Sequence, residues 1–212
     1  MIKQFTFNHF EVNTYLIIDE GTKQCAIVDP ACEASFEDAQ LTQYIEAEQL
    51  QVTHILLTHA HVDHIAGLRQ VCAAYGLPVT MHAEGHHLLR QASVYGSVMG
   101  FNVPPLDDLE QRHIADGDVL AIGQTFVECR YTPGHCPGSM SFYVKDRNAV
   151  LTGDALFHFS IGRTDLPGGD YDLLIDSLKQ KILSLDDAVA VLPGHGISST
   201  VGKERRYNPY LQ

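Results

Sequence analysis

Hydrophobic and polar positions along the chain follow two patterns, which predict two kinds of element. Short apolar runs rich in β-branched residues predict strands, and apolar positions spaced three or four apart predict amphipathic helices. The predicted strands cover residues 14–18, 25–28, 53–57, 79–82, 118–122, 125–131, 139–145, 149–151 and 188–192. The predicted helices cover residues 36–50, 65–75, 84–98 and 171–184, and an irregular loop is predicted at 102–108.

Turn-forming residues separate these elements. Residues 19–22 (DEGT) predict a hairpin turn between the first two strands, and Asp29-Pro30 ends the second strand. Gly76 and Pro78 end the helix at 65–75. Because strands occur in both halves with helices between them, we expect an α/β fold with two sheets and helices packed outside them.

Composition supports a folded core and one large domain. The 212 residues are 45% hydrophobic, and no apolar run approaches the roughly 18 residues that span a bilayer. The first residues lack the apolar core of a signal peptide, so a cytoplasmic protein is expected. The five cysteines are scattered without CxxC spacing, which is typical of reduced thiols.

The charge balance narrows the class of partner. A formal net charge of −12 argues against a nucleic-acid or anionic-membrane surface, so the expected partner is a small molecule. Three basic residues gather near the end of the sequence, at Lys203, Arg205 and Arg206. They fit a solvated terminal helix and a pocket for an anionic group equally well. Nothing in the sequence indicates an oligomeric state.

The most informative segment is residues 58–64 (THAHVDH), which follows the apolar strand at 53–57. It puts three imidazoles and a carboxylate within six positions. At a strand end, His59 and His61 can point at one metal ion while Asp63 and His64 reach a second. Nitrogen and oxygen ligands suit zinc, manganese or iron, and the absence of a cysteine cluster argues against a closed structural zinc site. The segment predicts a metal-dependent enzyme.

Three more polar side chains follow predicted strands. Each comes directly after a glycine, whose backbone freedom lets the next side chain be aimed into a cleft. These residues are His135, Asp154 and His195. Because strand-end loops on a rigid sheet commonly carry ligands, these residues are candidates for the same site.

Together these seven residues form the pattern H-x-H-x-D-H followed by a distant His, Asp and His, which resembles the metallo-β-lactamase superfamily. Residues 132–139 (TPGHCPGS), 152–157 (TGDALF) and 160–165 (SIGRTD) are similar to its glyoxalase II branch. Residues 166–170 (LPGGD) resemble the small bacterial glyoxalase II-like hydrolases. The resemblance implies an αββα four-layer sandwich over residues 1–212, without the C-terminal helical domain of full-length glyoxalase II.

The resemblance also implies a ligand set for two divalent metal ions. One ion would be held by His59, His61 and His135. The other would be held by Asp63, His64 and His195, with Asp154 bridging the two. Zinc is the first expectation, with iron or manganese as alternatives. Two such ions can share a hydroxide, because a metal ion lowers the pKa of bound water toward ~7. His59, Asp63 and Asp154 are the expected catalytic residues, Asp63 also orienting the nucleophile.

The implied reaction is hydrolysis of a thioester, S-lactoylglutathione giving lactate and glutathione. Another small ester or thioester is an alternative substrate. An alternative of another class is an iron-dependent persulfide dioxygenase, which would use a single iron on His59, His135 and Asp154. A β-lactamase is disfavoured because it needs export to meet its drug.

For several other residues near these motifs, the sequence allows more than one role. Arg163 pairs either with a substrate carboxylate or with a neighbouring aspartate. Tyr143 and Lys145, on the strand after His135, are weaker candidates for substrate contacts. Asp29 either orients a ligand imidazole through its far nitrogen or simply forms a turn before Pro30.

Overall fold

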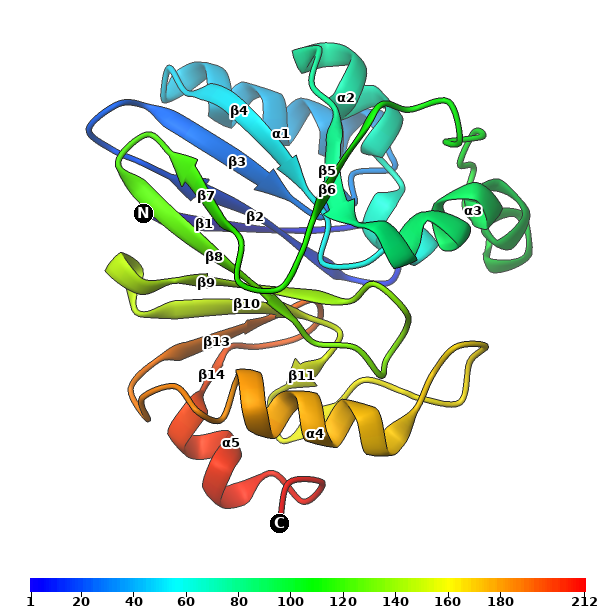
Figure 1. Ribbon diagram of the computed structural model, residues 1–212. Helices are drawn as coiled ribbons and strands as arrows, with labels where there is room; N and C mark the ends of the chain where they lie inside the picture. Colours follow the sequence, from blue (N-terminus) through cyan, green and yellow to red (C-terminus); the bar gives the residue numbers. More distant parts are fainter.

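The computed structural model describes all of residues 1–212 and contains two six-stranded sheets (Figure 1). The first sheet has the order β1-β2-β3-β4-β5-β6, with antiparallel pairing from β1 to β3 and parallel pairing from β3 to β6. Its strands are β1 (Ile2–Phe7), β2 (Val12–Ile18), β3 (Gln24–Val28), β4 (Gln51–Leu56), β5 (Val79–His82) and β6 (Gln111–Ile114).

The second sheet has the order β14-β13-β10-β9-β8-β7, and only the pair β10–β13 is parallel. Its strands are β7 (Val119–Ile122), β8 (Thr125–Tyr131), β9 (Met140–Val144), β10 (Ala149–Gly153), β13 (Ala190–Pro193) and β14 (Ser199–Thr200). A separate small hairpin pairs β11 (Leu156–Phe157) with β12 (Ser160–Ile161).

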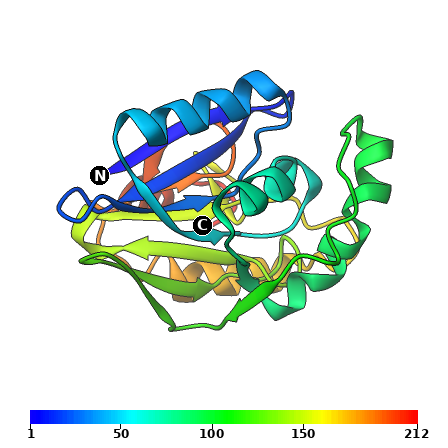
Figure 2. The same ribbon diagram turned by 90° about the horizontal axis from the view of Figure 1, so that it is seen from above.

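Helices cover the outer face of each sheet. In Figure 1, α1, α2 and α3 lie on the side of the first sheet, and α4 and α5 lie on the side of the second. Figure 2 looks down on α1 and α2, with α4 beyond the sheets. The α-helices are α1 (Ser35–Ala47), α2 (Leu68–Tyr75), α3 (His86–Met99), α4 (Tyr171–Lys181) and α5 (Val201–Tyr207). Short 3₁₀ helices are η1 (Val62–Ile65), η2 (Ala83–Gly85) and η3 (Lys145–Arg147).

Three buried apolar clusters hold these four layers together. One joins the helices α1 to α3 to the first sheet, for example Leu41 to Phe5. A second fills the space between the sheets, where Ile17 and Phe142 are fully buried. The third packs Leu178 of α4 on the second sheet. All seven residues of β2 are buried, because helices cover one face of its sheet and the second sheet covers the other. The predicted αββα sandwich is confirmed.

Most predicted elements are present within a few residues, and the differences have local causes. Strand 125–131 is β8 itself, and Gly76 ends α2 with a φ of 63°, as its position after the helix predicts. Strands β1, β6 and β14 and the hairpin β11–β12 lie outside the predicted set. Only Ile114 of β6 is buried, so this edge strand carries no clear hydrophobic pattern.

The basic cluster near the end of the sequence belongs to the scaffold. Arg205 of α5 donates hydrogen bonds to Asp187 and to the carbonyl oxygens of Leu183 and Leu185. Arg206 donates to the same aspartate. These contacts hold α5 against the preceding loop, so the anion-pocket alternative is not borne out. No helix combines the length and apolar character needed to cross a bilayer.

Candidate metal centre

Four strands of the two sheets end at one place, and each delivers predicted ligands. β4 leads into residues 58–64, β8 into the loop that carries His135, β10 into Asp154 and β13 into His195. The sheets are joined there by a hydrogen bond from Met140 N to Thr58 O at 2.7 Å. The structure thus brings all seven predicted ligands to one edge of the sandwich.

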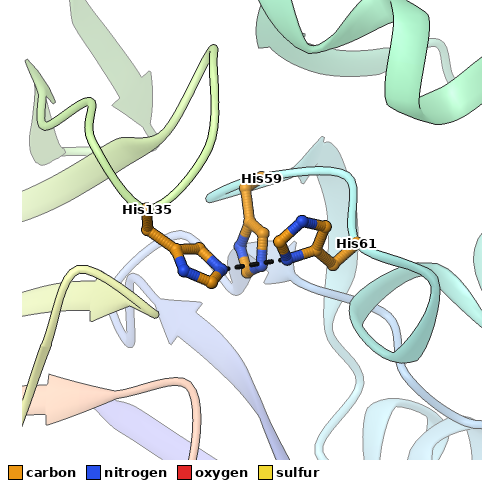
Figure 3. A group of neighbouring side chains, drawn as sticks. All are labelled: His59, His61 and His135. Atoms are coloured by element: carbon orange, nitrogen blue, oxygen red, sulfur yellow. Dashed lines mark hydrogen bonds between the residues drawn. The ribbon is translucent and has the colours of Figure 1, made fainter. Parts of the chain in front are cut away.

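The first group is His59, His61 and His135 (Figure 3). One ring nitrogen of each lies within 4.8 Å of the other two. Nε2 of His135 lies 2.9 Å from Nδ1 of His61. Nε2 of His59 is buried and has no hydrogen-bond partner. Since buried polar atoms are normally paired, the free lone pair of this nitrogen fits a metal ligand.

The second group is Asp63, His64 and His195. Nε2 of His195 lies 3.3 Å from both Nε2 of His64 and Oδ2 of Asp63. Asp154 lies between the two groups. Its Oδ1 is 3.2 Å from Nε2 of His64, and its Oδ2 is 3.5 Å from Nε2 of His195 and 3.8 Å from Nε2 of His135. This placement suits a bridging carboxylate.

The protonation states of the first group also fit a metal site. Burial, reinforced by the neighbouring imidazoles, lowers the pKa of His59 well below its ordinary value. Burial and the adjacent His135 lower the pKa of His61 to about 4. Burial is the largest single influence on Asp154 and opposes its ionisation, but the attraction of His64 and hydrogen bonds with His195 and His64 together outweigh it, and its pKa falls well below the usual range. Neutral imidazoles and an ionised carboxylate are the forms that bind metal ions.

The imidazoles of the second group hold protons that a metal ion would replace. Burial disfavours the charged form of His195, but hydrogen bonds with Asp154 and Asp63 raise its pKa to about 9. His64, beside the same carboxylates, has its pKa raised in the same way. A divalent ion here would supply the positive charge that these carboxylates otherwise draw from the imidazoles. The residues therefore fit two divalent metal ions.

Outer hydrogen bonds fix the orientation of three imidazoles. His64 donates from Nδ1 to Oδ2 of Asp29 at 3.0 Å, and His135 donates from Nδ1 to the carbonyl of Arg163 at 2.8 Å. His195 donates from Nδ1 to the carbonyl of Phe10 at 2.9 Å. Each bond leaves Nε2 pointing at the centre, which is how outer contacts tune metal ligands. Of the two readings of Asp29, the structure thus favours orientation of a ligand.

A glycine before His195 is required by close packing. A Cβ built on Gly194 would overlap Oδ1 of Asp154 and Cε1 of His64. Any side chain at this position would therefore displace two predicted ligands.

The hairpin between β1 and β2 supports the second group from outside, and the sequence analysis did not identify it as part of the site. Asn8 donates from Nδ2 to the carbonyl of Asp63 at 2.9 Å. The buried Asn13 donates from Nδ2 to the carbonyls of Pro193 at 3.0 Å and Gly196 at 2.9 Å, on either side of His195. Asparagine beside a strand start carries no chemical signal in one sequence, so only the fold shows this contact.

Replacing Asn13 by alanine should loosen the 193–196 loop and weaken the second metal site. The carbonyl of Pro193 keeps only the hydroxyl of Tyr15 as a donor, and that of Gly196 loses its bond to Asn13, which costs about 0.5–1.5 kcal/mol of stability per lost hydrogen bond. Metal analysis and thermal unfolding of Asn13→Ala would measure both effects. The matched control is Gln4→Ala, because Gln4 bonds Oδ1 of Asn13 without touching the loop. Equal metal content in Asn13→Ala and wild type would contradict this role.

A cavity of about 380 Å³ opens above the ligands. One wall is a face of α3, including Leu88, Tyr95 and Met99, and Phe10 closes one end. The opposite wall is the 163–167 loop, with Arg163 on it. Arg163 also forms two 2.8 Å hydrogen bonds to the carboxylate of Asp165. The structure therefore shows the pairing with a neighbouring aspartate, and it places Arg163 on the cavity wall, where pairing with a substrate carboxylate stays a prediction.

Tyr143 and Lys145 do not line the cavity, which corrects their selection as substrate contacts. β9 begins at Met140, next to Thr58, and runs away from the site. Tyr143 lies about 10 Å further along at ~3.3 Å per residue. There its ring lies 4.9 Å beneath the guanidinium of Arg130. Nearness to His135 in sequence was misleading because a strand moves quickly away from its own end.

Comparisons with known proteins agree with this geometry. The sequence model of the metallo-beta-lactamase superfamily matches residues 8–195. A probable metallo-hydrolase, YqgX of Bacillus subtilis, is 41% identical over 95% of this chain and 92% of its own length. The hydroxyacylglutathione hydrolase GloC of Haemophilus influenzae is 35% identical over 95% and 93%. The mitochondrial persulfide dioxygenase ETHE1 of Bos taurus is 33% identical over 93% and 70%.

Two solved structures superpose on the whole chain. The B3 metallo-beta-lactamase BLEG-1 has a TM-score of 0.87 at 35% identity and covers all of both chains. TTHA1623 in a di-iron-bound form has a TM-score of 0.87 at 33% identity, over 99% of this chain and all of its own. With the family match and the clustered His and Asp ligands, these likenesses lead to one conclusion: the chain belongs to the metallo-beta-lactamase superfamily.

Proposed function

We propose that the protein is a metal-dependent thioester hydrolase that converts S-lactoylglutathione to lactate and glutathione. The observation that carries the proposal is the pair of three-residue ligand groups joined by Asp154 beneath an open cavity. The identity with GloC supports the thioester as substrate. We further propose zinc as the metal, with iron as the alternative that the di-iron neighbour suggests, and the cytoplasm as location.

Two divalent ions, when bound, polarise a carbonyl and make water a nucleophile at neutral pH. Side chains of the protein position the reacting groups. Asp63, which lines the cavity next to His195, orients the attacking water. Water adds to the thioester carbonyl carbon, the C–S bond breaks, and the departing sulfur takes the proton.

No protein nucleophile competes for this role. Cys136 follows His135 in sequence, but it is buried, and burial raises the pKa of its thiol to about 12. A thiol protonated at neutral pH and closed off from solvent is a poor nucleophile. It packs against Ser139 instead.

The deciding experiment is hydrolysis of S-lactoylglutathione by protein purified without chelator, with metals measured on the same sample. Turnover that is lost on chelation and restored by metal supports the proposal. Oxygen consumption with glutathione persulfide, without thioester turnover, would replace it with the dioxygenase that the identity with ETHE1 suggests. Hydrolysis of a β-lactam alone would point to the activity in the name of BLEG-1.

Arg163 should affect substrate binding more than turnover. It lines the cavity, but its side chain is 60% exposed, so solvent screens its attraction for an anionic substrate. Arg163→Ala should therefore raise KM for the anionic thioester by up to about fivefold, with little change in kcat. Asp165→Ala frees the guanidinium and should lower KM. A rise in KM for both variants would mean that the ion pair only shapes the loop.

A further inference from the structure

The two walls of the cavity differ in chemical character. Along α3, Leu88, Ala92, Tyr95 and Met99 recur at helical spacing and line the cavity together. Phe10 extends this apolar wall at one end. We refer to these five residues as the α3 wall.

The α3 wall keeps apolar surface in contact with water beside the ligand groups. Tyr95 is 44% exposed and Met99 is 42% exposed. Since large apolar side chains gain by leaving water, such a surface at a binding cavity favours an apolar ligand group.

Apart from the histidines, the basic side chain of the cavity lining lies on the opposite side. Arg163 is the one arginine among the lining residues, and lysine is absent from them. The polar lining residues contributed by α3 are His87 and Gln91. A carboxylate of the substrate would therefore lie toward Arg163, leaving the α3 wall to an uncharged group.

We propose that the α3 wall determines specificity by binding the acyl group of the thioester, and that the preferred acyl group is larger and more apolar than lactoyl. This inference rests on the proposed hydrolase function. It places the anionic thiol carrier toward the Arg163 loop and an aliphatic or aromatic acyl chain along Tyr95 and Met99.

The test compares S-mandeloylglutathione with S-lactoylglutathione, whose acyl groups differ only by phenyl in place of methyl. We expect kcat/KM to be at least about tenfold higher for the mandeloyl ester, since a single methylene in an apolar pocket already gives about tenfold or more. A ratio of one or below would overturn the proposal.

Substitutions on α3 test whether the preference for the larger acyl group arises from the α3 wall. Tyr95→Ala and Met99→Ala should each reduce the mandeloyl-to-lactoyl ratio severalfold, and both positions are exposed enough for the chain to fold. Val94→Ala is the matched control, because Val94 is 68% exposed on the same helix and lies outside the cavity lining. An unchanged mandeloyl-to-lactoyl ratio in both Tyr95→Ala and Met99→Ala would show that the acyl preference does not arise from the α3 wall.

Binding of thioethers that cannot be hydrolysed separates this inference from the hydrolase proposal. S-benzylglutathione should bind more tightly than S-methylglutathione, and Tyr95→Ala should narrow the gap. Tighter benzyl binding without turnover of either thioester would reject the hydrolase and still support the α3 wall. Turnover of both thioesters at equal kcat/KM would retain the hydrolase and reject the wall.

Discussion

Replacing Asp154 by alanine should lower kcat/KM for thioester hydrolysis by about 10³-fold or more and reduce the bound metal below two ions per chain. Asp154 is the one carboxylate within 4 Å of imidazoles from both groups, His64 and His195 on one side and His135 on the other. Without it, the five imidazoles of the two groups converge with a single carboxylate, that of Asp63. Metal ions supply several kcal/mol of transition-state stabilisation, and each 1.36 kcal/mol is tenfold in rate.

Elemental analysis and steady-state kinetics on the same preparation would check this result. Asp146→Ala is the matched control, because it removes one carboxylate from an exposed 3₁₀ helix on the far end of β9. Asp154→Asn keeps the size of the side chain and isolates the loss of charge. Two bound ions and full activity in Asp154→Ala would exclude this residue as the bridge.

Replacing Asp29 by asparagine should weaken the second metal site by about 10–100-fold, although Asp29 is not placed among the ligands. Its buried carboxylate accepts three hydrogen bonds, from Thr58 N at 2.7 Å, Thr58 Oγ1 at 2.6 Å and His64 Nδ1 at 3.0 Å. Asparagine tolerates the positive φ of 51° at this position, so the backbone is preserved. Its amide offers only one acceptor oxygen and leaves a buried donor unpaired, at about 1–3 kcal/mol.

Competition with a chelator measures the metal affinity, and thermal unfolding measures the stability. Asp19→Asn is the control, since Asp19 is also buried and accepts hydrogen bonds from Thr22 Oγ1 and Gln124 N, far from the metal centre. It should lose stability with no change in metal affinity. Equal affinities in the two variants would show that Asp29 only supports the turn.

The sequence predicts the clustering of the seven candidate ligands, which the structure shows, because these residues are dense and chemically distinctive. Residues 58–64 carry four ligands on one turn, and the three distant ligands each follow a strand and a glycine. The fold class follows from the alternation of strands and helices. Neither inference needs knowledge of which strands become neighbours.

The walls of the cavity could not be predicted, because they depend on which elements become neighbours in the fold. Tyr95 and Met99 look like ordinary apolar positions on an amphipathic helix, and only the packing of α3 above the ligands gives them a second role. Tyr143 and Lys145 failed as predictions because closeness along a strand was taken as closeness in space. Asn13 reaches Gly196 across 183 positions, a contact that no local pattern carries.

Each ligand group is divided between the two sheets: residues 58–64 give two ligands to each, and the loops of the second sheet add His135 to one and His195 to the other. His195 lies 131 positions beyond His64. During synthesis on the ribosome, each ligand group therefore has only two of its three residues until His135 or His195 has been added. Since a ligand stabilises the state that binds it, metal uptake favours the joined sandwich over its separate halves.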